Sequence, residues 1–297
     1  MQRAEILRFA PSPTGALHLG SALSALTGFA IARHLGGRFL VRMEDTDQTR
    51  CRPELAAAIL ADLAWLGVSW EEPVLVQSQH YDVYRQAAAR LEAMGLLYPC
   101  FASRTEILAA ADPNARDPDG APLYPRLHKG MAPVEVARRR ARDEPVALRL
   151  DMDKALAAAT RLLGGALLTF EALDEYGQPT TVTAQPERWG DVVIVGKERP
   201  TSYHLSVVVD DARQGVTLVT RGLDLLAATD LHRLLQVLLN LPAPRYHHHR
   251  LVLAEDGKKL SKSARDTSIA DLRAAGASPA DIRRLIGPID LSSWPRR

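Results

Sequence analysis

Apolar and polar positions alternate along the first hundred residues in a way that predicts strands and helices in turn. A short apolar run at Glu5–Ala10 ends in a Pro-Ser-Pro-Thr-Gly turn, which is typical of a strand entering a tight loop. Apolar residues then recur with helical spacing over His18–Leu35 and stop at a Gly-Gly pair. The same reasoning predicts a strand at Arg38–Met43 and helices at Glu54–Leu66 and Tyr81–Leu97. This alternation predicts an α/β fold, with a parallel sheet covered by helices.

The alternation breaks after Tyr98. A loop rich in Pro, Gly and Asp follows at Asp112–Pro125, then a basic helical run at Val134–Arg142. A strand is expected at Val146–Asp151, and a glycine-containing linker comes after it. The change of pattern predicts an α+β insertion over residues 99–186.

Strand-type runs resume after the insertion, at Asp191–Val195, Leu205–Val209 and Val216–Thr220, and a helix is expected at Thr229–Leu239. The last segment holds a lysine-rich loop and two short helices. The expected domains are the first half of the main domain at 1–98, the insertion at 99–186, the second half of the main domain at 187–245 and a C-terminal segment at 246–297.

Length and charge narrow the picture. The 297 residues can bury a sizeable core, and 46% apolar with 24% charged residues is ordinary for a globular protein. The net charge is only +2, but from Leu241 onward 11 Lys and Arg stand against 6 Asp and Glu. A polyanion partner is therefore expected first in this last fifth of the chain.

Export and membrane insertion are not expected. Two cysteines, Cys51 and Cys100, do not suggest a disulfide-built domain, and Cys51 is interpreted as structural. The first residues lack the apolar segment of a signal peptide. The most apolar early stretch, Ser21–Ala32, is too short to cross a membrane. A cytoplasmic location is the expectation.

Two segments suggest phosphate chemistry. His18, Gly20 and Ser21 stand where a helix is expected to begin, and a helix N-terminus offers unpaired N–H groups and positive dipole to phosphates. Far downstream, Asp256–Ser263 joins a glycine to clustered lysines and serines, which could clamp a triphosphate. Taken singly, the first could be chance and the second a solvated basic loop.

Together and in this order, HLGS and KLSKS resemble the signatures of class I aminoacyl-tRNA synthetases, which bind ATP on a Rossmann-type sheet. Five segments in sequence, RFAPSPTGALHLGS, RMEDTD, TSYHLSVVVDD, TRGLDLL and GKKLSKS, resemble the glutamyl branch. The resemblance covers residues 5 to about 270 and is weakest in the insertion. It implies a Rossmann-type catalytic domain and a short helical C-terminal segment that carries the KLSKS loop.

The resemblance also implies an amino-acid site. A dicarboxylic amino acid needs cationic partners for its carboxylates and an anion for its ammonium group, and guanidinium groups match carboxylates better than lysine does. Outside the motifs, Arg221 and Tyr203 would instead be interpreted as a surface salt bridge and a tyrosine at the edge of the core. The implied glutamate contacts are Arg8, Ala10, Ser12, Glu44, Tyr203 and Arg221.

The implied reaction has two steps. The α-carboxylate of glutamate attacks the α-phosphate of ATP, and an RNA hydroxyl then attacks the acyl carbon of glutamyl-adenylate. His18 and Lys262 are expected to contact the transition state, without a covalent enzyme nucleophile, and Mg²⁺ is expected to accompany ATP. The implied ATP contacts are Pro11, His18, Gly20, Ser21, Lys259, Ser261 and Lys262.

Length distinguishes two glutamyl families. Only 34 residues follow Ser263, whereas full glutamyl-tRNA synthetases carry a large helical anticodon-binding region there. The chain therefore resembles the truncated paralogues, the glutamyl-queuosine tRNA(Asp) synthetases. They activate glutamate without tRNA and esterify it to the queuosine base at the wobble position of tRNA(Asp). Leu225 agrees, because full synthetases usually carry tryptophan there. No anticodon-binding domain is expected, the anticodon loop of tRNA(Asp) is the expected partner, and the protein is expected to be a monomer.

One departure concerns metal. The paralogue family often binds zinc in the insertion through a Cys-x-Cys pair, a tyrosine and a further cysteine. Here Cys100 and Tyr124 are present, but Ala102 stands where the second cysteine would be. One thiolate and one phenol cannot complete a tetrahedral site, so no structural zinc and no other metal site is expected, and packing should hold the insertion together.

Other candidates stay open. His247–His249 is expected to be a loop leading to the KLSKS segment rather than a metal site, since three consecutive side chains do not converge on one ion. The Arg138–Arg142 run fits a solvated helix face and an RNA phosphate contact equally well. Two alternative functions remain: a minimal synthetase that charges a tRNA 3′ end, and a silent RNA-binding paralogue. The presence of His18 and Lys262 speaks against the silent paralogue.

Overall fold

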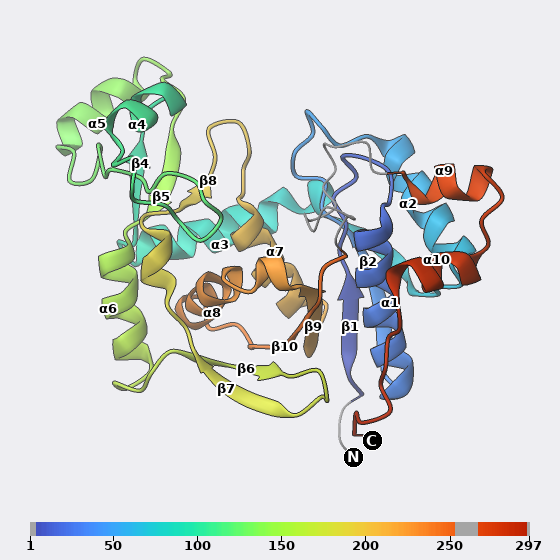
Figure 1. Ribbon diagram of the computed structural model, residues 1–297. Coiled ribbons are helices and arrows are strands. Elements are labelled where there is room, and N and C mark those ends of the chain that lie inside the picture. The colour runs from blue at the N-terminus through green and yellow to red at the C-terminus, as the bar shows by residue number, and fades with distance from the viewer. Residues whose placement is uncertain (1–3, 253–266, 296–297) are drawn as a thin grey trace.

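The computed structural model describes residues 4–252 and 267–295. The first half of the fold is a parallel sheet of β1 (Ile6–Phe9), β2 (Arg38–Met43) and β3 (Glu71–Val76), in that order. Helices α1 (Leu19–His34) and α2 (Pro53–Trp65) connect these strands. The predicted parallel sheet with covering helices is confirmed, while β3 was not predicted (Figure 1).

Helix α1 packs closely on this sheet. Leu23, Leu26 and Ile31 are buried in a core shared with both neighbouring strands. Gly28 marks the closest approach, because a Cβ there would meet Thr220 Oγ1 at 2.7 Å and the Phe39 ring at 3.1 Å. This tight contact fixes the height of α1 above the strands, and with it the position of the helix start.

A second parallel unit follows later in the chain. Its elements are α7 (Tyr203–Arg213), β9 (Leu218–Gly222), a 3₁₀ turn η3 (Leu223–Leu225), α8 (Ala228–Leu238) and β10 (Arg245–His249). Strand β10 pairs in parallel with both β9 and β6 (Thr169–Leu173). Beside β1, the N–H of Thr217 donates to the carbonyl of Ile6 at 2.9 Å. The two sheets therefore lie edge to edge.

Two predictions were wrong here. Leu205–Val209, expected as a strand, lies within α7, where Ser202 caps the helix by accepting from the N–H of Leu205. A short run of four apolar residues interrupted by Ser206 fits a buried helix as well as a strand, so the pattern did not decide between them. His247–His249, expected as a loop, belongs to β10.

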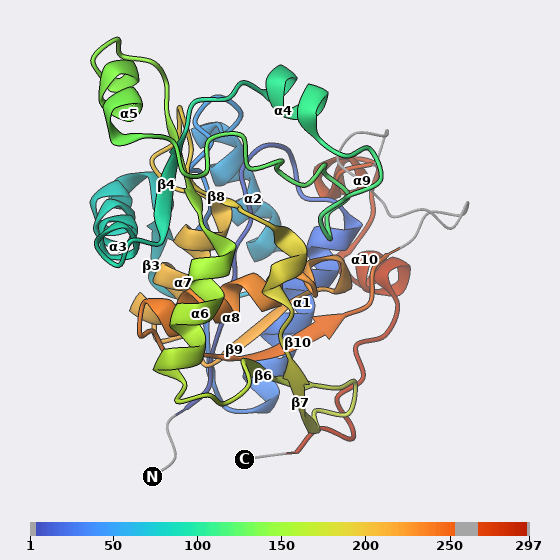
Figure 2. The same cartoon turned by 90° about the vertical axis from the view of Figure 1, so that its left-hand side faces the viewer.

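An antiparallel sheet crosses both expected bounds of the insertion, because its first strand begins at Leu97 and its last strand lies beyond residue 186. Strands β4 (Leu97–Cys100), β5 (Ala147–Leu150) and β8 (Val193–Val195) form it, with β5 in the middle. Figure 2 shows this sheet beside helices α4 (Arg104–Ala110) and α5 (Pro133–Arg140), at the end of the molecule away from both termini. The predicted basic helix and the strand after it are thus present.

One predicted helix of this region is shorter than expected, and the other elements were not predicted. Helix α3 (Tyr81–Ala93) ends earlier than expected, before Gly95 at φ +70°, and Leu97 already belongs to a strand. Helix α6 (Met152–Leu162) packs on α8. Strands β6 (Thr169–Leu173) and β7 (Pro179–Thr183) extend the sheet of β9 and β10. Two further 3₁₀ turns are η1 (Gln77–His80) and η2 (Pro186–Trp189).

The C-terminal helices α9 (Ile269–Ala274) and α10 (Pro279–Ile286) confirm the two short helices expected there. Each begins with a capping box. In it a serine side chain accepts a hydrogen bond from the backbone N–H of an aspartate, and the aspartate side chain accepts one from the backbone N–H of the serine. Ile269 and Ile282 are fully buried in the core of α1 and α2. Among the described helices, none is long and apolar enough to cross a membrane.

Candidate active site

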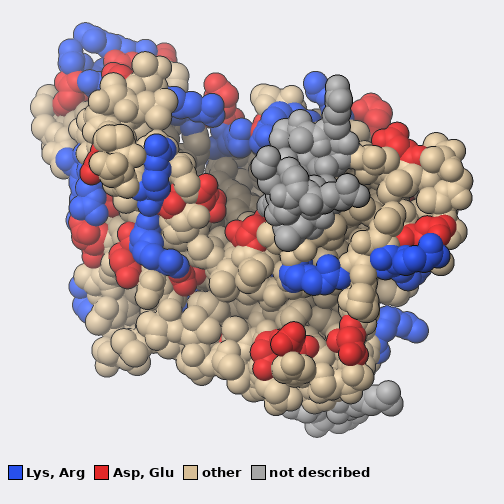
Figure 3. Space-filling view, viewed as in Figure 1, with Lys and Arg blue, Asp and Glu red and all other residues tan. Residues whose placement is uncertain are grey.

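Two cavities adjoin the turn between β1 and α1, and Ser12 lines both. The first has a volume of about 400 Å³ and the second about 720 Å³. The second lies between the end of β2 and the sheet of β4, β5 and β8, where Figure 3 shows the surface hollowed and rimmed by Lys and Arg side chains. The turn therefore places one residue at the junction of two binding spaces.

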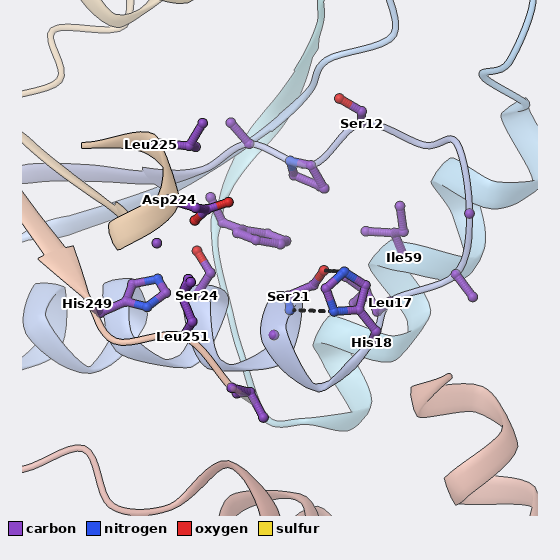
Figure 4. A pocket seen from close by; sticks show the side chains of 18 of the residues that line it. Ser12, Leu17, His18, Ser21, Ser24, Ile59, Asp224, Leu225, His249 and Leu251 are labelled. Atoms are coloured by element: carbon purple, nitrogen blue, oxygen red, sulfur yellow. Dashed lines mark hydrogen bonds between the residues drawn. The ribbon is translucent and has the colours of Figure 1, made fainter. Parts of the chain in front are cut away.

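Segments far apart in sequence build the first cavity. At one end His18 and Ser21 lie at the start of α1, and at the other end Asp224, His249 and Leu251 come from the second half of the fold (Figure 4). All four described residues of the expected ATP site line this cavity. They are Pro11, His18, Gly20 and Ser21.

His18 is fixed by the backbone that it caps. Its Nδ1 accepts from the N–H of Ser21 at 3.3 Å, and its Nε2 lies 3.1 Å from Ser21 Oγ. The ring covers Gly20, because a Cβ there would stand 3.1 Å from Nδ1 and Cε1. A side chain at this position would push the imidazole away by a few tenths of an ångström, so glycine lets the ring lie close against the first turn of α1.

The remaining ATP contacts expected from the sequence, Lys259, Ser261 and Lys262, lie outside the described residues, as does the rest of Asp256–Ser263.

The expected glutamate contacts are divided by the structure. Ser12, Glu44 and Tyr203 line the second cavity, and Ala10 lines the first. Arg8 and Arg221 line neither cavity and are 5% and 4% exposed. Four of the six residues therefore line a cavity, whereas the two arginines are buried among protein groups.

Arg8 belongs to a buried ion network. Its Nε donates to Asp211 Oδ1 at 2.9 Å, and Arg42 Nη1 donates to the same oxygen at 2.8 Å. Arg42 also pairs with Glu44 Oε1 at 3.0 Å. Sequence reasoning did not single out Arg42 and Asp211, although both lie in the segments RMEDTD and SVVVDD. Both are charged residues next to apolar residues in segments expected to be buried, and this could have indicated a buried ion pair.

Burial and pairing act in opposite directions on these carboxyl groups. Burial alone disfavours ionised Asp211, but the guanidinium groups of Arg8 and Arg42 outweigh it and hold the pKa of Asp211 below its usual range. For Glu44 burial dominates, so its pKa is raised despite the attraction of Arg42 and Arg8. The pKa of Arg42 is raised, since Asp211 and Glu44 together overcome its burial.

Arg221 has a different environment. Its Nη2 donates to Thr229 Oγ1 at 2.7 Å, its Nη1 lies 3.1 Å from His232 Nδ1, and its Nε donates to His248 Nε2 at 3.2 Å. The ring of Tyr203, which is 36% exposed, lies 5.6 Å from the ring of His232. Within residues 4–252 and 267–295, no carboxylate forms an ion pair with Arg221. Its surface salt-bridge interpretation is therefore wrong.

The insertion is held at the position where zinc was considered. Cys100 Sγ donates to Tyr124 Oη at 3.2 Å, and Ala102 is buried beside them. His128 Nδ1 accepts from the N–H groups of Phe101 and Ala102 at 3.0 and 3.3 Å. In the described part of the chain, no group of three or more His, Cys, Asp or Glu could hold a metal. Sequence reasoning missed His128.

The structure also places the histidine run and the arginine run that the sequence left open. In the histidine run, His247 Nδ1 contacts the Leu173 carbonyl, His249 Nδ1 contacts the Arg250 carbonyl, and His248 contacts Arg221, so the three rings do not converge. In α5, Arg138 and Arg139 both pair with Glu135 of their own helix. These intrahelical pairs suit a solvated helix face, and the RNA contact stays a prediction.

Comparison with known proteins agrees with this geometry. Residues 6–289 match the family described as tRNA synthetases class I (E and Q), catalytic domain. The sequence is 47% identical over 288 residues to a glutamyl-Q tRNA(Asp) synthetase from Rhodobacter capsulatus, covering 95% of this chain and 99% of that protein. It is 37% identical to a glutamate–tRNA ligase from Prochlorococcus marinus, covering 91% of this chain but only 55% of that protein.

A solved structure is also similar. It is a glutamate tRNA ligase from Elizabethkingia meningosepticum in complex with its amino acid, with a TM-score of 0.72 and 25% sequence identity. The likeness covers 99% of this chain and 66% of that one. The chain thus spans nearly the whole of one kind of relative and between about half and two thirds of the other kind.

Proposed function

The chain belongs to the class I tRNA synthetases of the glutamate and glutamine type, in the branch of the glutamyl-Q tRNA(Asp) synthetases, and from this we propose its reaction. It activates L-glutamate with ATP as glutamyl-adenylate and transfers the glutamyl group to the queuosine base in the anticodon of tRNA(Asp). The observation that carries the proposal is the pair of cavities joined at Ser12, one ending at the start of α1 and the other lined by Glu44 and Tyr203.

ATP is assigned to the smaller cavity. Its volume of about 400 Å³ lies within the range of small-molecule and cofactor sites. Leu225 and Leu251 offer apolar surface for the base at one end, and the N-terminus of α1 offers N–H groups for phosphates at the other. His18, held against Gly20, lies where it can hydrogen-bond to phosphate oxygens. Mg²⁺ bound to ATP would supply further charge neutralisation.

Glutamate is assigned to the neighbourhood of Ser12 and the larger cavity. Glu44 there supplies a carboxylate for the ammonium group, and Tyr203 supplies a hydroxyl. Arg221 is the guanidinium group best placed to attract a carboxylate, since Arg8 already shares Asp211 with Arg42. This order of importance differs from the equal roles that the resemblance implied.

Catalysis then consists of positioning and charge stabilisation. An oxygen of the α-carboxylate attacks the α-phosphorus, and the bond from that phosphorus to the leaving pyrophosphate breaks. In the second step a hydroxyl of the RNA attacks the acyl carbon, loses its proton, and AMP leaves. No enzyme nucleophile is needed. We assign to His18 and Lys262 the stabilisation of the negative charge that develops on the phosphates.

Glutamate-dependent exchange of pyrophosphate into ATP, without tRNA, tests the activation step. We expect exchange by the unaltered protein, and a loss of about 100-fold or more in His18→Ala. His80→Ala serves as the matched histidine control, because His80 lines neither cavity. Absence of exchange in the unaltered protein would contradict the proposal.

A further inference from the structure

Arg221 is a buried cation whose observed partners are all uncharged. Its hydrogen bonds run to Thr229, His232 and His248, at 2.7, 3.1 and 3.2 Å. The side chain is 4% exposed, and no described carboxylate pairs with it. A guanidinium group has five N–H donors, so at most three are used by these contacts. Burying such a group without a counter-ion is costly, which points to a ligand that supplies the missing charge.

The contacts fix the protonation of the histidines. Arginine can only donate, so His232 Nδ1 and His248 Nε2 must both carry lone pairs. The proton of His232 is then on Nε2, from which it donates to His204 Nδ1 at 3.2 Å. Burial, followed by the charge of Arg221, lowers the pKa of His204 to about 4 and that of His248 to about 3. Burial, followed by the charge of Arg221, also holds the pKa of His232 well below its usual value, so His232 and His248 are neutral acceptors near neutral pH.

In the ion network beside this site the charges cancel, and the buried Asp210 is offset by Arg213 at 2.9 Å. Arg8 and Arg42 stand against Asp211 and Glu44, with ion pairs of 2.9, 2.8 and 3.0 Å. Adding Arg221 gives this cluster one positive charge in excess. Free glutamate carries two carboxylates and one ammonium group near neutral pH, hence a net charge of −1. Glutamine carries a net charge of zero.

We propose that His232 and His248 are positioning residues that hold Arg221 without neutralising it, and that the resulting charge balance selects glutamate over glutamine. The proposal rests on the proposed glutamate site. With glutamate bound, the buried set becomes neutral. With glutamine bound, one cation stays uncompensated in a buried site, and the missing charge–charge contact is the basis of discrimination.

Near-isosteric pairs of variants test the charge separately from the shape. His232→Asn and His232→Asp differ in charge but hardly in size, and so do His248→Gln and His248→Glu. Each carboxylate variant would give Arg221 an internal counter-ion, whereas each amide variant keeps a neutral acceptor. Binding of glutamate and of glutamine is measured by calorimetry on the full chain, and thermal unfolding reports whether each variant folds.

We expect each carboxylate variant to bind glutamate at least about 10-fold more weakly than its amide partner. The ratio of the Kd for glutamine to the Kd for glutamate should also fall by at least about 10-fold. The Kd for ATP should differ little within a pair. Equal behaviour of the two members of both pairs would overturn the inference, as would equal binding of glutamate and glutamine by the unaltered protein. The two positions provide independent pairs if one variant does not fold. Pyrophosphate exchange in the same samples reports separately on the proposed function.

Discussion

Arg8 in the first strand and Asp211 in α7 form a buried ion pair, with Nε 2.9 Å from Oδ1, although they are 203 positions apart in the chain. Arg42 shares the same oxygen. One carboxylate thus joins the two halves of the fold under the site. Because two guanidinium groups depend on it, its removal leaves buried charge without a partner.

Asp211→Asn should therefore lower the free energy of unfolding by about 3–5 kcal/mol, measured by denaturant titration. Glu71→Gln is the control, because it breaks the ion pair of Glu71 with Arg38, in which both side chains are at least 44% exposed. An exposed pair contributes about 0–1 kcal/mol. Equal losses in the two variants would contradict the account of the network.

Gly20→Ala should impair activation by moving His18 rather than by unfolding the helix. A Cβ at this position stands 3.1 Å from the imidazole, so the ring must shift, whereas alanine itself favours helix. We expect pyrophosphate exchange to fall about 10-fold or more, with an unchanged or higher Tm.

A double-mutant cycle isolates the cause of this effect. In a His18→Ala background, Gly20→Ala should have little further effect on exchange, because the ring that it displaces is absent. Full additivity of the two substitutions would show that Gly20 acts by another route.

Acid should destabilise the protein through the histidines around Arg221. The folded pKa values of His204 and His248 are about 4 and about 3, whereas the unperturbed value is 6.5. The unfolded chain therefore binds more protons between these values, so the free energy of unfolding falls as the pH drops below about 6.5. The slope is up to about 1.4 kcal/mol per pH unit for each histidine.

Urea titrations at about pH 7 and about pH 5 measure this slope. Carboxylates contribute to acid sensitivity as well, so the comparison that matters is with His248→Gln. This variant should lose less stability between the two pH values than the unaltered protein. An identical loss would mean that His248 is already protonated in the folded state.

Zinc should not be needed by the insertion. Since His128 accepts two backbone N–H groups beside Cys100, a chelator is expected to leave the Tm unchanged, and metal analysis should find no stoichiometric zinc. His128→Ala should cost about 1–3 kcal/mol, because it leaves those N–H groups without an acceptor. Tight stoichiometric zinc in the purified protein would refute this prediction.

How far the sequence could predict this molecule depended on the range of the interactions. Helix α1 was found because its apolar periodicity and the Gly-Gly pair after it are local signals, and β2 was found as the short apolar run that follows this pair. Leu205–Val209 was misassigned because a short apolar run has no visible period, and the capping Ser202 was overlooked. Strand β3 was missed because its outer positions are exposed and it contains Pro73, which is unusual within a strand.

In the site, too, groupings of residues close in sequence were predictable, whereas contacts between distant residues were not. His18, Gly20 and Ser21 form one contiguous turn, so their grouping followed from the sequence and is seen in one cavity. The sharing of Asp211 by Arg8 and Arg42, and the histidine contacts of Arg221, join residues from separate elements. No local pattern encodes these pairings, which is why Arg8 and Arg221 seemed equivalent before the fold was known.

The acceptor assay tests the central claim most directly. Purified protein, ATP and labelled glutamate are incubated with tRNA(Asp) that contains queuosine, with tRNA(Asp) that lacks it, and with tRNA(Glu). The account predicts glutamate on the queuosine-containing tRNA(Asp) and on neither of the other two. Charging of tRNA(Glu) at its 3′ end, without transfer to tRNA(Asp), would contradict it.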